Sequence, residues 1–176
     1  MTRVLLAVAL LLLTACVPGA PDAGTGAGDG DARSAQLPDV TLAGFEGGEG
    51  IDLAALRGPA VINLWASWCG PCRKEMPLLQ QFHQRYGDRV RMVGIDFQDT
   101  QSAKAADLVE ETGVTYDLVV DEQGVINGQG AFPVIRGLPF LAFVDESGEV
   151  VHVEATVVES VDELVDDVDQ HLGVAL

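Results

Sequence analysis

Cysteine and histidine are scarce in this chain, with three of each among 176 residues. A structural zinc site normally takes four such ligands, as two Cys-x-x-Cys pairs or as one pair with closely spaced histidines. The chain has one Cys-x-x-Cys motif, from Cys69 to Cys72, and its remaining cysteine is Cys16. The histidines share no spacing and are interpreted as surface or core residues: His83, His152 and His171. These counts favour redox chemistry over half of a zinc site, and they predict no metal centre.

Basic residues are also few. Lys and Arg number 10 against 27 Asp and Glu, which gives a formal net charge of −17. This charge argues against nucleic acid and anionic lipid surfaces as partners, because both would repel the protein. The acidic run at 162–169 is interpreted as a solvated helix face, since its valines repeat at helical spacing and no EF-hand spacing occurs.

No hydrophobic run is long enough to cross a bilayer. The apolar run Val4–Leu13 has ten residues and follows the positive Arg3, a pattern typical of a signal peptide. It ends in Leu-Thr-Ala-Cys at 13–16, which resembles a bacterial lipobox. That resemblance implies removal of residues 1–15 and attachment of lipid to Cys16. An ordinary secretory signal followed by an unrelated cysteine is the alternative.

Bulky apolar residues are nearly missing from the next segment. Residues 16–36 are rich in Gly, Ala, Asp, Pro and Ser, so they cannot bury enough surface to offset the entropy of ordering. We predict a flexible tether behind the lipidated Cys16, with a reach on the order of 25 Å. Residues 37–176 have the length of one domain with an adequate core.

The hydrophobic pattern of this domain predicts an α/β fold. Val61–Trp65 is a continuous apolar run, as expected of a central strand covered on both faces. Ser160 is a plausible N-cap of a terminal helix, and Pro77 is expected to kink an earlier one. Strands are predicted at 40–45, 61–65, 90–97, 118–120, 140–145 and 150–154. Helices are predicted at 52–56 (a single turn), 72–86, 102–112 and 161–172.

The Cys-Gly-Pro-Cys turn lies between a predicted strand and a predicted helix. A helix N-terminus carries about half a positive charge and free N–H donors, which favour a thiolate. Cys69 is therefore expected to be the exposed nucleophile, and Cys72, one turn into the helix, to close onto its sulfur. Pro71 needs no N–H in a first helical turn, and Gly70 lets the backbone turn tightly beside a substrate.

Several motifs together resemble a known family. They are Asn-Leu-Trp-Ala-Ser-Trp-Cys-Gly-Pro-Cys-Arg-Lys-Glu-Met-Pro at 63–77, Gly-Leu-Pro at 137–139, Phe-Val-Asp at 143–145, and Gly148. The order of motifs and elements resembles the TlpA/ResA-like branch of extracytoplasmic thiol-disulfide oxidoreductases, within the redoxin group. The resemblance implies a thioredoxin fold, with a central mixed sheet flanked by helices, an N-terminal β extension and a central insertion at 96–120.

The resemblance also implies roles for residues around the cysteine pair. Cys69 attacks a substrate disulfide, and Cys72 resolves the mixed disulfide. Glu75, three residues after Cys72 on one helical face, exchanges protons with it; the alternative is a carboxylate that only favours the helix. Asn63 lies where cytoplasmic thioredoxins carry a buried acid. An amide cannot titrate, so Glu75 would take over that work.

The implied substrate-binding residues lie on both sides of the motif. Pro139 is expected to follow a cis peptide bond, with Leu138 pairing with the substrate backbone. Trp68 is expected to offer an apolar face to partners, whereas Trp65 is expected in the core. Phe140-Leu141 follows the proline at the positions where members of the family often have two threonines. This difference bears on substrate preference. The full predicted set is Trp68, Gly70, Pro71, Leu138 and Pro139.

We predict an extracytoplasmic, membrane-anchored protein-disulfide oxidoreductase that exchanges electrons with protein thiols and disulfides. The Cys69–Cys72 pair is its redox centre, and no further cofactor is expected. The Gly-Pro dipeptide favours a reductase, and the resemblance implies a membrane electron donor and clients such as apocytochrome c. One alternative is a disulfide-forming oxidant with the same site. Another is a thiol peroxidase, although Cys69 lacks the threonine of the Thr-x-x-Cys motif that such enzymes commonly use. A third is a lipoprotein whose thiols bind a metal or haem.

Overall fold

The computed structural model describes residues 36–176, so the predicted signal peptide, Cys16 and all but the last residue of the predicted tether lie outside the described residues. The strands are β1 (Thr41–Gly44), β2 (Ile51–Asp52), β3 (Ala60–Trp65), β4 (Arg91–Phe97), β5 (Asp117–Asp121), β6 (Phe140–Val144) and β7 (Val150–Glu154). The helices are α1 (Gly70–Tyr86), α2 (Ser102–Thr112) and α3 (Val161–Leu172), with short 3₁₀ turns η1 (Phe45–Gly47) and η2 (Leu53–Ala55).

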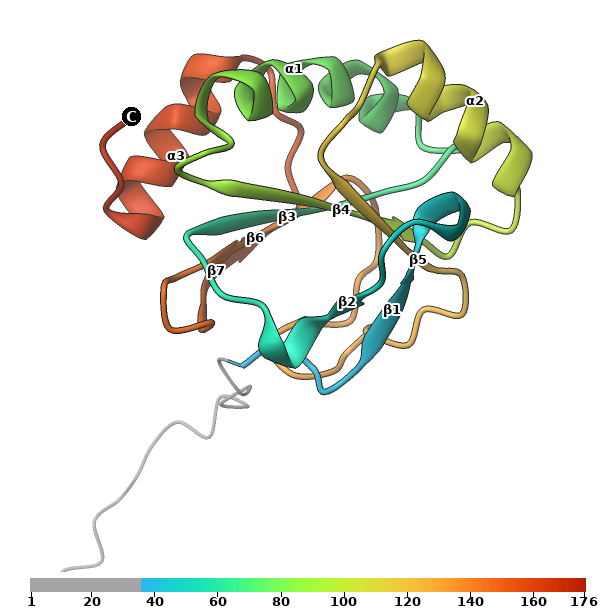
Figure 1. The fold of residues 1–176 in the computed structure, drawn as a ribbon, viewed down its shortest axis with the longest axis horizontal. Coiled ribbons are helices and arrows are strands. Elements are labelled where there is room, and N and C mark those ends of the chain that lie inside the picture. Colours follow the sequence, from blue (N-terminus) through green and yellow to red (C-terminus); the bar gives the residue numbers. More distant parts are fainter. Residues whose placement is uncertain (1–35) are drawn as a thin grey trace, which may run out of the picture. The chain divides into compact units, whose positions relative to one another are not determined.

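The strands of residues 36–176 form one seven-stranded mixed sheet in the order β2-β1-β5-β4-β3-β6-β7 (Figure 1). Strands β3, β4 and β5 are parallel, whereas β6 and β7 add antiparallel neighbours on one side. On the other side β1 pairs antiparallel with β5, and β2 pairs with β1, which is the predicted N-terminal β extension. Gln36 already belongs to this unit, because it forms a bridge with Glu149.

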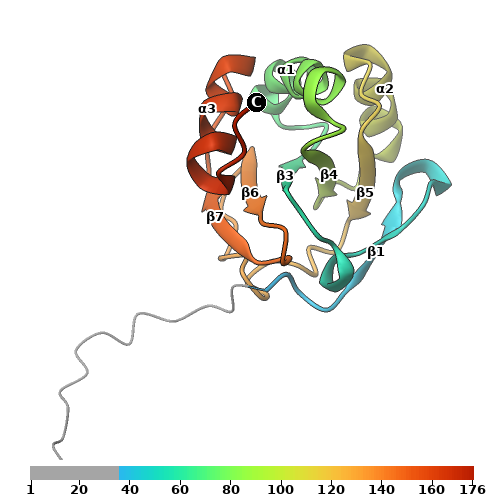
Figure 2. The same cartoon turned by 60° about the vertical axis from the view of Figure 1, so that its left-hand side comes forward.

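The three α-helices of the described residues lie on the same face of the sheet (Figures 1 and 2). The opposite face is covered by the segment from β1 to η2 and by residues 122–139, which contribute Leu53, Ile126 and Phe132 to a second core. Side chains of β3 alternate between the cores: Val61 and Trp65 face the helices, and Ile62 and Leu64 face away. The predicted burial of the central strand on both faces is therefore confirmed.

Most element boundaries lie within two residues of their predicted positions, and those of α2, α3 and β7 coincide with them. Helix α1 begins at Gly70 rather than Cys72, because Cys69 acts as its N-cap and Pro71 fits its first turn. The helix continues through Pro77 to Tyr86. Strand β2 was not predicted, since two residues carry no periodic signal.

Helix α3 begins as the sequence predicts. The Ser160 Oγ accepts a hydrogen bond from the Glu163 backbone N–H at 3.1 Å, and Leu164 and Val168 are buried against the sheet. The cap fixes where the helix starts. The loop before it is buried at Val158.

We expect Ser160→Ala to lower the free energy of unfolding by about 1 kcal/mol, because a helix N–H loses its acceptor. Urea denaturation of the oxidised protein measures this loss. Ser160→Asp is the matched control, since aspartate is an equally good N-cap and should retain stability. Equal stability of Ser160→Ala and the wild type would contradict the capping role.

Candidate active site

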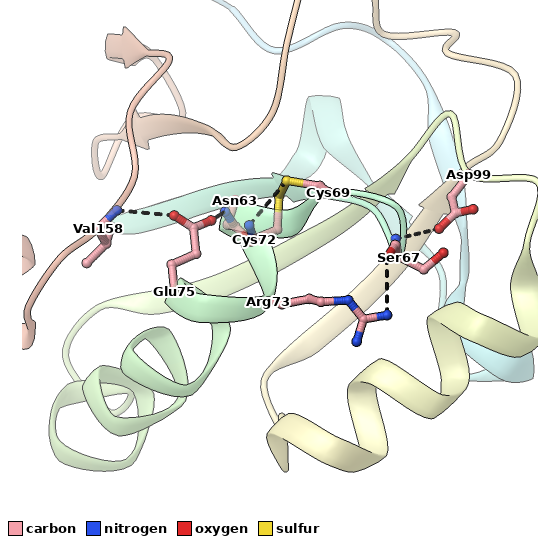
Figure 3. Close-up of a disulfide and its surroundings, with 8 residues drawn as sticks. All are labelled: Asn63, Ser67, Cys69, Cys72, Arg73, Glu75, Asp99 and Val158. Carbon is pink, nitrogen blue, oxygen red and sulfur yellow. Dashed lines mark hydrogen bonds between the residues drawn. A yellow bond between two sulfur atoms is a disulfide. The ribbon is translucent and has the colours of Figure 1, made fainter.

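The cysteine pair lies at the N-terminus of α1, directly after the central strand. Cys69 and Cys72 form a disulfide, with Cα atoms 5.3 Å apart. The Cys69 sulfur caps the helix by accepting a hydrogen bond from the Cys72 N–H at 3.2 Å (Figure 3). The same N–H and the positive helix end favour negative charge on this sulfur once the disulfide opens. The predicted closure of Cys72 onto Cys69 is confirmed.

The predicted exposure of Cys69 is wrong. Cys69 is 3% exposed and Cys72 is fully buried, because the disulfide turns both sulfurs into the helix-side core. The exposed rim of the motif consists instead of Trp68, which is 54% exposed, together with Gly70 and Pro71. A partner therefore meets the indole and the turn before it reaches sulfur.

The proline loop lies beside the motif. The Leu138–Pro139 peptide bond is cis, as the resemblance implied. Strand β6 starts at Phe140, which pairs with Leu64 of β3, so Pro139 lies next to the end of the strand that leads into the cysteine turn. Trp65 is fully buried there, as predicted for a core residue. A second cis bond, before Pro59, was not predicted.

Glu75 is a buried carboxylate one helical turn after Cys72. One oxygen accepts a hydrogen bond from the Asn63 Nδ2 at 2.8 Å, and the other accepts one from the Val158 N–H at 3.1 Å (Figure 3). Burial raises the pKa of Glu75 to about 7, against the lowering effect of these two hydrogen bonds. A carboxyl group with this pKa can both accept and release a proton near neutral pH.

Two aspartates at the end of β4 were not predicted as site residues. The Asp99 carboxylate accepts from the Ser67 N–H at 2.6 Å and from the Gln101 N–H at 2.9 Å, and so holds the loop before Cys69 (Figure 3). Asp96 lies opposite Trp65 in the sheet register. Asp96 lies near the carboxyl end of β4 and Asp99 just after it. Sites of α/β proteins gather at this end of parallel strands, and this placement could have indicated both residues.

Asp96 is another buried acid near the motif, besides Glu75 and Asp99. Burial, followed by the nearby Asp99 and Glu122, raises its pKa to about 7. Its Oδ1 atom has no hydrogen-bond partner among residues 36–176. The site thus holds two carboxyl groups that change charge in the same pH range.

The histidines divide into two groups. His83 lies on α1 near Tyr116, with ring centroids 5.9 Å apart. His152 of β7 and His171 of α3 lie together, although 19 positions separate them in the sequence. Sequence spacing did not predict this pairing, because it arises from the packing of α3 on the sheet.

We expect Glu75→Gln to flatten the pH dependence of stability. The pKa of Glu75 is about 7 in the folded protein, against an ordinary value of 4.5 in the unfolded chain. The folded state therefore binds this proton more tightly, and the group favours folding at low pH. Its contribution is lost as the pH rises through this range, by roughly 3 kcal/mol in all. Glutamine keeps an oxygen for the Val158 N–H. Its NH₂ can face the Asn63 Oδ1, which has no partner within residues 36–176.

Urea denaturation of the oxidised proteins at about pH 5 and about pH 8 measures this difference. The contribution of Asp96 is common to both proteins and cancels. Glu110→Gln, on the exposed side of α2, is the matched control and should follow the wild type. An unchanged pH slope in Glu75→Gln would show that Glu75 is not the group that titrates.

Comparison with known proteins identifies the family and the relatives of this chain. Residues 34–153 match the AhpC/TSA family. Thioredoxin-like protein YneN of Bacillus subtilis is 32% identical over 125 residues, which are 67% of this chain and 69% of YneN. Thiol-disulfide oxidoreductase ResA of Bacillus thuringiensis is 30% identical over 119 residues, which are 66% of this chain and 65% of ResA.

A solved structure extends the comparison to the fold. The secreted Mycobacterium tuberculosis disulfide oxidoreductase described as homologous to DsbE is 26% identical, with a TM-score of 0.63, over 75% of this chain and 96% of that protein. These similarities confirm the predicted thioredoxin-like fold, the resemblance to ResA and the enzyme class of thiol-disulfide oxidoreductase. Since the family match covers more than half of its residues, the chain belongs to the AhpC/TSA family.

Proposed function

We propose that this protein is a membrane-anchored extracytoplasmic reductase that passes two electrons from the Cys69–Cys72 dithiol to disulfides of other proteins. The observation that carries the proposal is the arrangement of three groups on one helix end. A sulfur caps the helix, a second sulfur lies within bonding distance, and a carboxyl group with a pKa of about 7 follows one turn later. The exchange uses no cofactor beyond the cysteine pair.

The reaction takes place in two exchanges. The Cys69 thiolate attacks one sulfur of the client disulfide, forms a mixed disulfide and releases the other client sulfur as a thiolate. The Cys72 thiolate then attacks the Cys69 sulfur, and the second client sulfur leaves. The enzyme is oxidised to the Cys69–Cys72 disulfide, and the client gains two electrons and two protons.

Glu75 is proposed as the proton acceptor for Cys72. Cys72 is fully buried and lies away from the exposed rim of the motif, so its thiol cannot lose a proton directly to bulk water. Glu75 lies one turn further along α1, on the same helical face. A buried acid with a pKa of about 7 is ionised for part of the time at neutral pH and can take that proton.

The surface beside the motif is the proposed client site. An open groove of about 440 Å³ lies next to the cysteine turn, lined by Pro71, Lys74, Leu78, Val157, Val158 and Glu159. The exposed Trp68 adds an apolar face, and Leu138, before the cis proline, offers backbone groups for strand-like pairing with an extended client segment. The predicted roles of Gly70 and Pro71 are in keeping with their exposure.

The direction of electron flow is inferred from the turn sequence. The Gly-Pro dipeptide between the cysteines is that of reducing thioredoxins, which favours a reductase. We propose a membrane protein as electron donor and apocytochrome c, whose haem-binding cysteines must be reduced, as one client class. The reduction potentials of thioredoxin and of a strong disulfide-forming oxidant differ by about 150 mV, or roughly 7 kcal/mol.

We expect the Cys69–Cys72 pair to have a reduction potential near that of thioredoxin, about −270 mV. Equilibration of the full-length protein with graded thiol buffers, followed by quantification of free thiols, measures it. A value near about −120 mV would reverse the direction and indicate a disulfide-forming oxidant.

Two cysteine variants separate the roles of the sulfurs. Cys72→Ser should accumulate a mixed disulfide with a client peptide, because the resolving sulfur is missing, whereas Cys69→Ser should form none. Retention of full exchange activity by the double variant would overturn the assignment of the site.

Anchoring through Cys16 is proposed from the sequence alone, since this residue lies outside the described ones. None of the helices within 36–176 is long and apolar enough to cross a membrane. We expect Cys16→Ser to move the protein from the membrane fraction to the soluble fraction of the producing cell and to abolish incorporation of labelled fatty acid. A Cys16→Ser protein that stays with the membrane would contradict lipid anchoring.

A further inference from the structure

A cluster of metal-ligating side chains lies away from the cysteine pair, between β7 and α3. His152 and Glu154 are two positions apart in β7, so their side chains lie on the same face of the strand. His171 belongs to the last turn of α3, which packs on this part of the sheet (Figure 2). One ligand atom from each of the three residues lies within 4.8 Å of the other two. We propose that His152, Glu154 and His171 form a binding site for a divalent transition-metal ion.

The ligand atoms of the cluster lie further apart than they would around a bound ion. The His152 Nε2 and a Glu154 oxygen are 3.9 Å apart, and the rings of His152 and His171 stack with centroids 3.8 Å apart. Ligands of a tetrahedral ion at bond lengths of about 2.0–2.1 Å lie roughly 3.4 Å from one another. The ligand atoms therefore need to approach by about 1 Å and one ring must turn, since parallel imidazoles do not point at a common ion.

The surroundings permit this adjustment. The side chains of His152 and Glu154 are 36% and 30% exposed, so each has space to rotate and an ion can enter from solvent. The His171 Nε2 lies 3.4 Å from the exposed side-chain amide of Gln170, which can move aside. The second oxygen of Glu154, Oε1, is buried and has no hydrogen-bond partner among the described residues. A bound ion would satisfy the carboxylate that the fold leaves incompletely paired.

The helix carries one more carboxylate on this side. Asp167 precedes His171 by four residues, so both lie on the same face of α3. The proposed site takes two neighbouring ligands from a strand, His152 and Glu154, and one from a helix, His171.

The ligand set selects the class of ion. Two imidazole nitrogens and one or two carboxylates suit Zn²⁺ and related ions, whereas Ca²⁺ and Mg²⁺ prefer oxygen alone. The acidic α3, with five carboxylates between 162 and 169, draws cations towards the site. Bound metal would join the last helix to the edge of the sheet, and we expect it to stabilise the folded state by mass action.

Titration of the full-length, oxidised protein with Zn²⁺ by calorimetry tests the proposal. The disulfide keeps Cys69 and Cys72 from acting as ligands, so binding at the histidine cluster is separated from binding by these two sulfurs. We expect one ion per chain, and a loss of affinity of more than about tenfold in the His152→Gln, His171→Gln double variant. Zinc should also raise the thermal unfolding midpoint of the wild type but not of that variant.

The imidazole resonances give an independent readout. The chain has only three histidines, so NMR can follow each one during the titration. We expect Zn²⁺ to shift the signals of His152 and His171 and to leave His83 unchanged. Equal shifts in all three, absence of binding, or undiminished binding by the double variant would overturn the site.

A second pair of variants covers failure of the double variant to fold. Glu154→Gln removes one ligand and keeps the side-chain size, and it should weaken Zn²⁺ binding by more than about tenfold. Glu146→Gln, an exposed residue at the tip of the same hairpin, is the matched control for the lost charge and should bind as the wild type does. Equal affinities of the two variants would overturn the proposed role of Glu154.

Discussion

The buried carboxylate of Glu75 connects the parts of the molecule on which the redox site depends. Its two oxygens bind Asn63 of β3 and the backbone of Val158 before α3, while its own backbone belongs to α1. A buried charge is costly unless it is hydrogen-bonded, and here the partners come from elements up to 83 residues apart. One titratable group thereby links the central strand, the helix of the cysteines and the last helix.

The charge on the Cys69 sulfur depends on two opposing effects. The N-terminus of α1 favours a thiolate at Cys69, whereas burial disfavours any charge there. In the proposed mechanism the buried Glu75 would accept the proton of Cys72, which then need not reach solvent. The aspartates at the end of β4 add further negative charge next to the motif. The reactivity of the pair is consequently set by its neighbours as much as by the Gly-Pro dipeptide.

Sequence reasoning located the elements that have local signals. Periodicity and capping predicted the helix of 102–112, the cap at Ser160 and the continuous run of β3, and the spacing of the cysteines predicted the motif. Features that depend on tertiary packing were not predicted. The burial of Cys69, the loop contact of Asp99 and the meeting of His152 with His171 arise only when distant segments pack together. The local sequence around a residue carries no signal of the distant residue that it contacts in the folded protein.

The inward-facing disulfide gives the protein a form of kinetic insulation. Exchange requires the attacking sulfur to reach the disulfide, and both of its cysteines are almost fully buried. A low-molecular-weight thiol brings little binding energy with which to expose them, whereas a docked protein segment brings more. The pair would therefore reach equilibrium slowly with dissolved thiols and faster with docked protein partners.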